Sequence, residues 1–118
     1  MAKRPSHRRD EVLGRTTMPM DWELTVLPVS NVEWNHEKAE RNIKKHGVGF
    51  EDAARIFLNP IVARDDDHGE EFRTLAIGLS GDHVLVVVFT ERRDAVRIIS
   101  ARKATAAERK RLGAHLRR

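Results

Sequence analysis

Two apolar runs near the C-terminal end carry the clearest pattern of the chain. The first, 84–89, is apolar at every position, which is typical of a central strand covered on both faces. The second, 96–102, follows the charged residues 91–94. Because side chains alternate across a strand, the even-numbered residues from Val96 to Arg102 are expected on one face and Arg97, with the other odd-numbered ones, on the opposite face. Together the runs predict an antiparallel hairpin.

Capping residues and periodicity predict three helices and three further strands around this hairpin. The first helix, His36–His46, begins after Asn35 and ends at Gly47, with Ala39, Ile43 and His46 expected on one stripe. A capping box of Thr105 and Glu108 begins the last helix, which ends near Leu116. The other elements are expected at 32–34 (strand), 50–58 (helix), 61–64 (strand) and 72–79 (strand). The order β-α-α-β-β-β-β-α predicts an α+β fold: an antiparallel β-sheet with two N-terminal helices and a C-terminal helix.

Residues 1–28 differ in composition from the rest of the chain. Proline, glycine and basic residues interrupt any regular element there, so this segment buries too little surface to offset its ordering entropy. We expect 1–28 to be a disordered or loosely docked extension, in which Trp22 and its apolar neighbours form at most a short extended piece. The folded domain is expected at 29–118.

The distribution of charge says more than the net value of +4. Residues 101–118 hold seven basic side chains and one acid, which indicates either a polyanionic partner or a solvated helix face. The acidic run 65–71 is interpreted as a solvated loop rather than a metal site. The chain has no cysteine, no apolar run long enough to span a bilayer and no secretory signal pattern, so a cytoplasmic protein without membrane partners is expected.

Several motifs, taken in order, resemble the BrnT family of toxins from bacterial type II toxin–antitoxin systems. They stand at 32–35, 42–48, 50–54, 76–78, 86–92 and 97–102. The resemblance implies a RelE-like fold, endoribonuclease activity on RNA and inhibition of translation and growth. It also implies a cognate, BrnA-like antitoxin with a ribbon-helix-helix DNA-binding module, through which alone the complex binds operator DNA. The first 30 residues have no counterpart in the pattern, and Asn35 stands where the family usually has Asp.

Cleavage of RNA without a metal ion needs a base near the ribose 2′-hydroxyl, cations around the phosphate and an acid for the leaving oxygen. The chain has no tyrosine, which removes one common base of RelE-like toxins. The candidate catalytic residues are His46, Arg73, Glu91, Arg97 and Arg102. The candidate RNA-binding residues are Lys44, Lys45, Arg92, Lys103 and Arg109. No metal site or cofactor is expected.

Each candidate also has a purely structural interpretation. His46 could cap its helix, because an imidazole near a helix C-terminus interacts favourably with the helix dipole. The arginines could form ion pairs with Glu33, Glu71 or Glu91 instead of binding phosphate. Regular alternation separates Arg97 from Arg102, so both reach one site only where the strand bends. The second hypothesis for function is therefore a non-catalytic module that binds nucleic acid or protein, such as an inactive toxin homologue.

Overall fold

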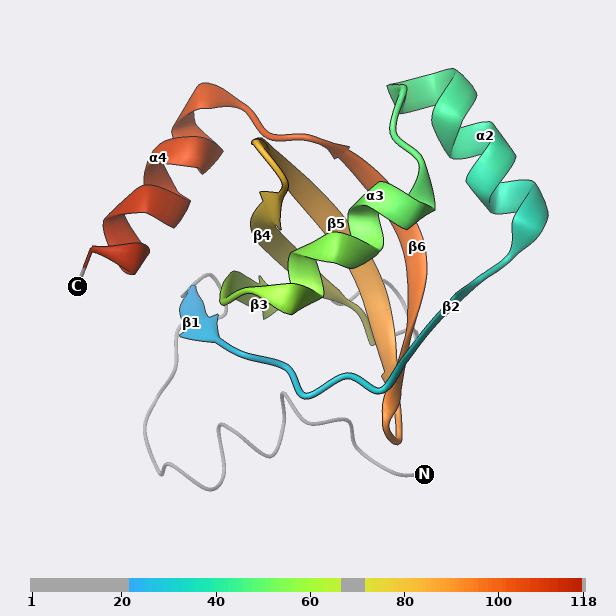
Figure 1. The fold of residues 1–118 in the computed structure, drawn as a ribbon, viewed down its shortest axis with the longest axis horizontal. Coiled ribbons are helices and arrows are strands. Elements are labelled where there is room, and N and C mark those ends of the chain that lie inside the picture. The colour runs from blue at the N-terminus through green and yellow to red at the C-terminus, as the bar shows by residue number, and fades with distance from the viewer. Residues whose placement is uncertain (1–21, 67–71, 118) are drawn as a thin grey trace.

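The computed structural model describes residues 22–66 and 72–117 of the 118-residue chain (Figure 1). Six strands, three α-helices and a 3₁₀ helix lie within these ranges. The strands are β1 (Glu23–Thr25), β2 (Asn31–Trp34), β3 (Ile61–Asp65), β4 (Thr74–Ser80), β5 (His83–Arg92) and β6 (Ala95–Lys103). The helices are α2 (His36–His46), α3 (Phe50–Ala54), η1 (Arg55–Leu58, 3₁₀) and α4 (Ala106–Leu116). The predicted α+β class is confirmed, and no helix in these ranges is long and apolar enough to cross a membrane.

The sheet is mixed, so the predicted antiparallel sheet is wrong in one pairing. The strand order is β1-β3-β4-β5-β6-β2, and every neighbouring pair is antiparallel except β2 with β6, which is parallel. Between β2 and β6 lie α2, α3, η1 and strands β3 to β5, so the alternation within either strand does not encode their pairing. Strand β1, absent from the predicted order, pairs with β3 at the opposite edge.

The hairpin of β5 and β6 contains a β-bulge. Val88 lies opposite Ser100, whereas Phe89 lies opposite Ile98, so Ile99 is an extra residue in β6. An extra residue shifts the alternation of every residue that follows it. The predicted alternation from Val96 to Arg102 is therefore wrong beyond Ile98.

The bulge places the two arginines of β6 on one face of the sheet. Ile98 and Ala101 both belong to one core cluster, three residues apart rather than two. Arg97 precedes Ile98 and lies on the opposite face, and Arg102 pairs with Val86, whose side chain belongs to the second core cluster. Regular alternation would place these two arginines on opposite faces, whereas the bulge places both on the same face.

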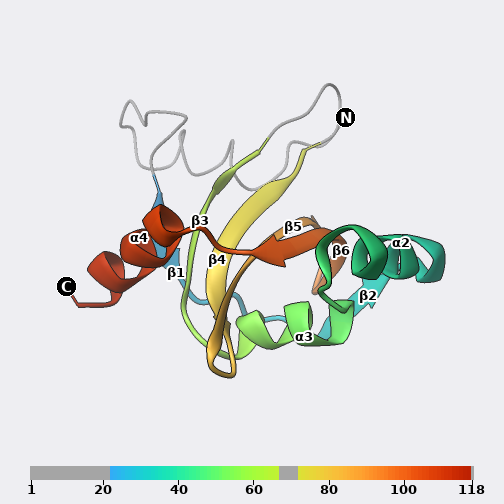
Figure 2. The same ribbon diagram turned by 90° about the horizontal axis from the view of Figure 1, so that it is seen from above.

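The sheet separates two apolar cores of different size. Helices α2, α3 and η1 cover one face, which we call the helical face (Figure 2). The larger core lies there and includes Phe50, Ile56 and Phe57 from the helices with Val87 and Phe89 from β5. The opposite face has a smaller core under α4. One face is therefore filled by helices, whereas on the other α4 covers only one end.

Helix α2 is attached to β6 through a buried asparagine. Asn42 Nδ2 donates to the carbonyl oxygens of Ala101 (2.8 Å) and Val48 (2.9 Å), and the Ala101 N–H donates to Asn42 Oδ1 at 3.1 Å. Strand β2 pairs with β6 only as far as Ile98. At Ala101 the Asn42 side-chain amide therefore satisfies the backbone N–H and C=O that a neighbouring strand would otherwise pair with. The predicted stripe needs a correction here, because Asn42 is buried and Ile43 is 51% exposed.

Most predicted boundaries agree with the structure. Asn35 and Gly47 bound α2, with Asn35 Oδ1 accepting from the Lys38 N–H, and the capping box of Thr105 and Glu108 is present. The helix expected at 50–58 changes from α to 3₁₀ at Arg55, where the chain tightens before it leaves the helix.

The expected boundary of the folded domain at residue 29 remains a prediction. Leu24 in β1 lies opposite Val62 of β3, and Trp22 packs against the smaller core. Residues 1–21, which make up most of the expected extension, lie outside the described part of the chain. The contacts of 22–25 show that this piece of the segment docks on the sheet edge.

Candidate functional site

Four arginines come together on the face opposite α3, which we call the arginine face. They are Arg64, Arg73, Arg97 and Arg102. Arg64 lies opposite Leu75, and Leu75 lies opposite Val88. Arg73 immediately precedes β4. Its neighbour Thr74 lies opposite Phe89, which is in the core of the helical face, so alternation places the Arg73 side chain on the arginine face.

The register aligns these side chains in two rows across the sheet. The first row contains Arg64, Leu75, Val88 and Ser100 on β3 to β6. The second contains Glu33, Arg97 and Thr90, and extending the β4–β5 register by one residue adds Arg73. Arg73 and Arg97 stand two strands apart in this row, about 10 Å at the usual strand spacing. Two guanidinium groups at that separation can reach one phosphate together.

Helix α4 covers only one end of the arginine face. Its Leu112 packs with Val62, Ile77 and Val86 in the smaller core. The two arginine rows lie beyond this core. The residues that stand between the arginines in these rows, Leu75, Val88 and Thr90, are half-buried. No helix within 22–66 or 72–117 covers these rows (Figure 2).

Arg97 makes an ion pair and keeps further donors. Its Nη1 donates to Glu33 Oε1 at 2.9 Å, with 35% of the Arg97 side chain and 46% of the Glu33 side chain exposed. This is one of the ion pairs that the structural interpretation anticipated. Nε and Nη2 donate to no residue in the described part of the chain, and guanidinium carries five N–H groups in all. Arg97 can therefore hold Glu33 and an anion at once.

Arg102 is held in a tighter pair. Its Nη1 and Nη2 donate to the two oxygens of Glu108 at 2.8 and 2.9 Å, and Glu108 Oε1 also accepts from the Thr105 N–H. Hydrogen bonds from Arg102 lower the pKa of Glu108 to about 2, and the same bonds raise the pKa of Arg102. This bidentate pair ties β6 to the first turn of α4, so Arg102 has fewer donors left for a phosphate than Arg97.

Sequence reasoning missed Arg64 and Trp22. The Arg64 guanidinium lies 5.0 Å from the centre of the Trp22 ring, and so does that of Arg111 on α4. The Arg64 position follows from alternation in β3, where Val62 and Arg64 share a face away from Ile61. That signal was available in the sequence, because a strand was predicted at 61–64, but Arg64 was not considered as a phosphate ligand.

The structure does not bring the two predicted bases onto the arginine face. Glu91 lies opposite Val96, a residue of the helical core, so its side chain starts from the other face of β5. His46 is the half-buried last residue of α2, and it makes no hydrogen bond or ion pair with any residue that the structure describes. Their catalytic roles remain predictions without geometric support.

The predicted RNA-binding residues are spread over the surface. Arg92 is exposed at the end of β5, on the arginine face by alternation, whereas Lys103 falls on the helical side. Lys44 and Lys45 are exposed in the last turn of α2. The Arg109 guanidinium on α4 donates to the Ala104 carbonyl at 3.1 Å. Of these residues, the sheet register associates only Arg92 with the arginine rows.

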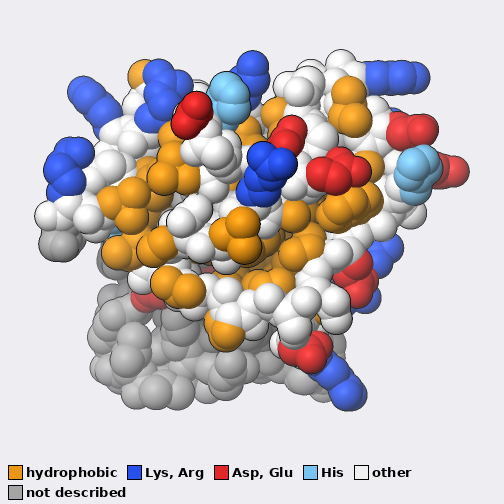
Figure 3. Space-filling model, viewed as in Figure 1, with side chains coloured by type: hydrophobic (Ala, Val, Ile, Leu, Met, Phe, Trp, Pro, Cys, Tyr) orange, Lys and Arg blue, Asp and Glu red, His pale blue; other side chains and the backbone are white. Residues whose placement is uncertain are grey.

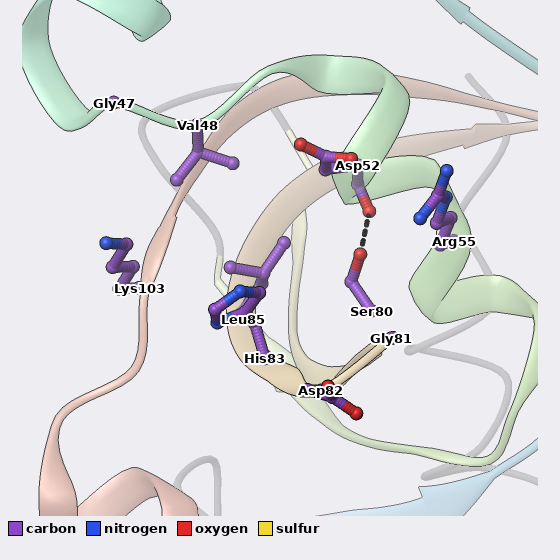
Figure 4. A pocket seen from close by; sticks show the side chains of 10 residues that line it. All are labelled: Gly47, Val48, Asp52, Arg55, Ser80, Gly81, Asp82, His83, Leu85 and Lys103. Atoms are coloured by element: carbon purple, nitrogen blue, oxygen red, sulfur yellow. Dashed lines mark hydrogen bonds between the residues drawn. The ribbon is translucent and has the colours of Figure 1, made fainter.

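A pocket of about 440 Å³ lies away from these rows, between α3 and the turn from β4 to β5 (Figure 4). Ser80 fixes one wall by donating to the Asp52 carbonyl at 2.7 Å. Its lining includes Asp52, Arg55, Asp82 and Lys103, together with His83. This mixture of acids and bases favours no single ligand charge, unlike the arginine rows.

No cluster that could hold a metal ion occurs among the residues that the structure describes. Asp65 and Asp66 are described, whereas Asp67, Glu70 and Glu71 lie outside that part of the chain, as do His7 and His68. Asp65 is the last residue of β3 and lies opposite Thr74, so the acidic loop begins later than expected. For 67–71 its interpretation as a solvated loop stays a prediction.

Comparison with known proteins agrees with the motifs. A family model described as the ribonuclease toxin BrnT of type II toxin–antitoxin systems matches residues 34–108, more than half of the chain. The matched range includes β3 to β6 and therefore all four arginines of the arginine face. A search of curated proteins gives no match. The chain belongs to the BrnT family of ribonuclease toxins of type II toxin–antitoxin systems.

Proposed function

We propose that this toxin is a metal-independent endoribonuclease whose arginine face binds the scissile phosphate. One observation carries the proposal: Arg64, Arg73 and Arg97, from or beside three different strands, lie on one sheet face that no described helix covers. A sheet holds such side chains in fixed positions, and fixed donors aimed at a developing charge lower a reaction barrier more than mobile ones.

The chemistry that fits this face is attack by the ribose 2′-oxygen on the adjacent phosphorus. The nucleophile belongs to the substrate, so the protein needs only to bind the phosphate and move protons. As the 2′-oxygen approaches, negative charge on the phosphoryl oxygens increases. Arg97, with its remaining donors, and Arg73 in the same row stabilise this charge, while Arg92 and the exposed lysines of α2 bind flanking phosphates. Lys103 and Arg109 contact more distant parts of a long RNA.

The cognate antitoxin, in this proposal, neutralises the toxin by covering the arginine face. An acidic or aromatic segment suits this surface, because charged partners steer association and aromatic rings stack on guanidinium groups. The antitoxin contributes the ribbon-helix-helix module that binds operator DNA, and the free toxin cleaves RNA in the cytoplasm and stops translation. Association should slow at high salt and on replacement of Arg97 by Ala. An association rate indifferent to both changes would exclude this docking face.

The decisive experiment maps the ends of the cleaved RNA. Purified toxin, separated from its antitoxin, is incubated with a long RNA in the presence of EDTA, and with DNA of the same sequence. We expect cleavage of RNA alone, with 2′,3′-cyclic phosphate ends or their opened products. Products with a 3′-hydroxyl, or loss of activity on chelation, would contradict the mechanism.

Arg97→Ala tests the site, with Arg41→Ala as its matched control. Arg41 is exposed on α2 and makes no hydrogen bond or ion pair with a described residue. We expect Arg97→Ala to reduce the cleavage rate by about 10²–10³-fold, the usual loss for one preorganised donor. Affinity for an uncleavable 2′-deoxy substrate should fall much less. Wild-type protein that binds RNA without cutting it would favour the alternative of a non-catalytic module.

A further inference from the structure

The arginine face also carries a carboxylate that the sequence pattern did not single out as catalytic. We propose that Glu33 is the general base that removes the proton from the ribose 2′-hydroxyl. This inference rests on the proposed function and adds the residue that the mechanism lacks. Of the two bases predicted from the sequence, Glu91 lies opposite Val96 of the helical core, and His46 is the last residue of α2.

The position of Glu33 follows from strand β2. Val32 and Trp34 pack against the helical core, so alternation turns Glu33 to the arginine face between them. Its partner in the register is Arg97, and the parallel pairing of β2 with β6 brings the two side chains to 2.9 Å. If β2 did not pair with β6, Glu33 would not stand beside Arg97 in this row.

The pair combines the two functions that the reaction needs at neighbouring points. Glu33 makes one described contact, from Oε1 to Arg97, so Oε2 accepts no hydrogen bond from a described residue. The half-exposed carboxylate is open to a substrate, and the remaining donors of Arg97 lie next to it. The 2′-hydroxyl of a nucleotide lies beside its own 3′-phosphate, so a phosphate held by Arg97 presents its 2′-hydroxyl near Glu33.

Glu33 accepts the 2′-hydroxyl proton while the 2′-oxygen forms a bond to phosphorus. The bond from phosphorus to the 5′-oxygen breaks, and that oxygen takes a proton from water as it leaves. Glu33 then returns its proton to solvent. The products are a 2′,3′-cyclic phosphate and a 5′-hydroxyl, with no change in oxidation state.

Two variants of Glu33 separate a base from a residue that only positions Arg97. Glu33→Gln keeps an oxygen that can accept the Arg97 hydrogen bond but cannot take up a proton, whereas Glu33→Asp keeps the carboxylate on a shorter side chain. A general base contributes about 10²–10⁴-fold to a rate. We expect Glu33→Gln to lose at least 100-fold in kcat, with unchanged affinity for a 2′-deoxy substrate and unchanged thermal unfolding. Glu33→Asp should recover part of the rate.

The pH profile gives an independent readout. In the wild type the rate should fall on the acidic side as the base becomes protonated, and Glu33→Gln should lose this limb. Glu37→Gln, an exposed substitution on α2, is the matched control and should keep it. The inference is overturned if Glu33→Gln keeps wild-type activity, or if the acidic limb disappears instead in Glu91→Gln, His46→Ala or Asp66→Asn. Retained activity in Arg97→Ala would refute the phosphate site itself, so failure of the base and failure of the site give different results.

Discussion

The two faces of the sheet differ in what fills them, although the same strands supply both. On the helical face, Phe57 of η1 packs edge-on against Phe89 of β5, with ring centres 5.0 Å apart. On the arginine face, the same strand presents Thr90 beside Arg97. Seen from outside, the helical side shows a band of apolar side chains with most charges at its margins (Figure 3).

This difference separates stability from chemistry within a small domain. Apolar burial on the helical face supplies most of the folding free energy, whereas the half-exposed pairs on the arginine face supply little of it. A chain of 118 residues has little surface to spare for a separate active-site scaffold. The alternation of a strand allows one set of residues to provide both.

Phe57→Ala should have the largest effect on stability. Truncation of a buried Phe removes the contact with Phe89 and leaves a cavity, which lowers the free energy of unfolding by about 3–5 kcal/mol. Leu58→Ala, at the adjacent residue that is 81% exposed, should change it by less than about 0.5 kcal/mol. Denaturant melts measure both, and equal losses would show that the helical face is not buried as described.

Asn42→Ala should have the next largest effect on stability. It leaves the Ala101 N–H and two carbonyl oxygens without their side-chain partner, at a cost of about 2–4 kcal/mol. Asn42→Asp should destabilise at least as much, because a carboxylate cannot donate to those carbonyls. Ile43→Ala, at an exposed position of the same helix, is the control, and hydrogen exchange at Ala101 should accelerate in the Asn42 variants alone.

Glu108→Gln should have a smaller effect that depends on pH. The pKa of Glu108 in the folded chain is lowered to about 2, below that of an unfolded Glu, so its ionisation stabilises the fold above about pH 4.5. This contribution is lost as the pH falls from 4.5 toward 2. Solvent screening limits it to about 1 kcal/mol. Melts at pH 7 and pH 2.5 should differ less for Glu108→Gln than for the wild type, and an equal difference would contradict the pairing with Arg102.

Arg97→Ala should have the smallest effect on stability, although we expect a large effect on cleavage. Its ion pair with Glu33 is half-exposed, and pairs of this kind contribute about 0–1 kcal/mol. A loss of several kcal/mol in a denaturant melt would mean that the arginine face is part of the structural core, and the contrast between the two faces would fail.

The sequence predicted the elements better than their arrangement. Helix α2 with its Asn35 cap, the capping box and the hairpin of β5 and β6 all follow from short-range patterns, because caps and alternation act within a few residues. The bulge at Ile99 and the parallel pairing of β2 do not follow from such patterns. Both depend on contacts between segments that are distant in sequence or on a single extra residue.

The same limits explain the candidate site. Arginines ending apolar strands could be recognised, and Arg73 and Arg97 do lie in one row of the sheet. Arg102 was also recognised, but its pairing with Glu108 depends on where α4 begins. Glu33 could be anticipated only as a partner of an arginine, because its place beside Arg97 needs the parallel strand. Roles for His46 and Glu91 came from their chemistry, which carries no information on position.

The pairing of β2 with β6 has a consequence for the timing of synthesis. Glu33 and Arg97 are 64 residues apart, so the second row of the arginine face cannot form until nearly the whole chain has been made. At 5–20 residues per second, translation from one to the other takes roughly 3–13 seconds. In the proposed mechanism, a nascent chain that has not yet placed β6 therefore lacks the phosphate-binding Arg97 while it is on the ribosome.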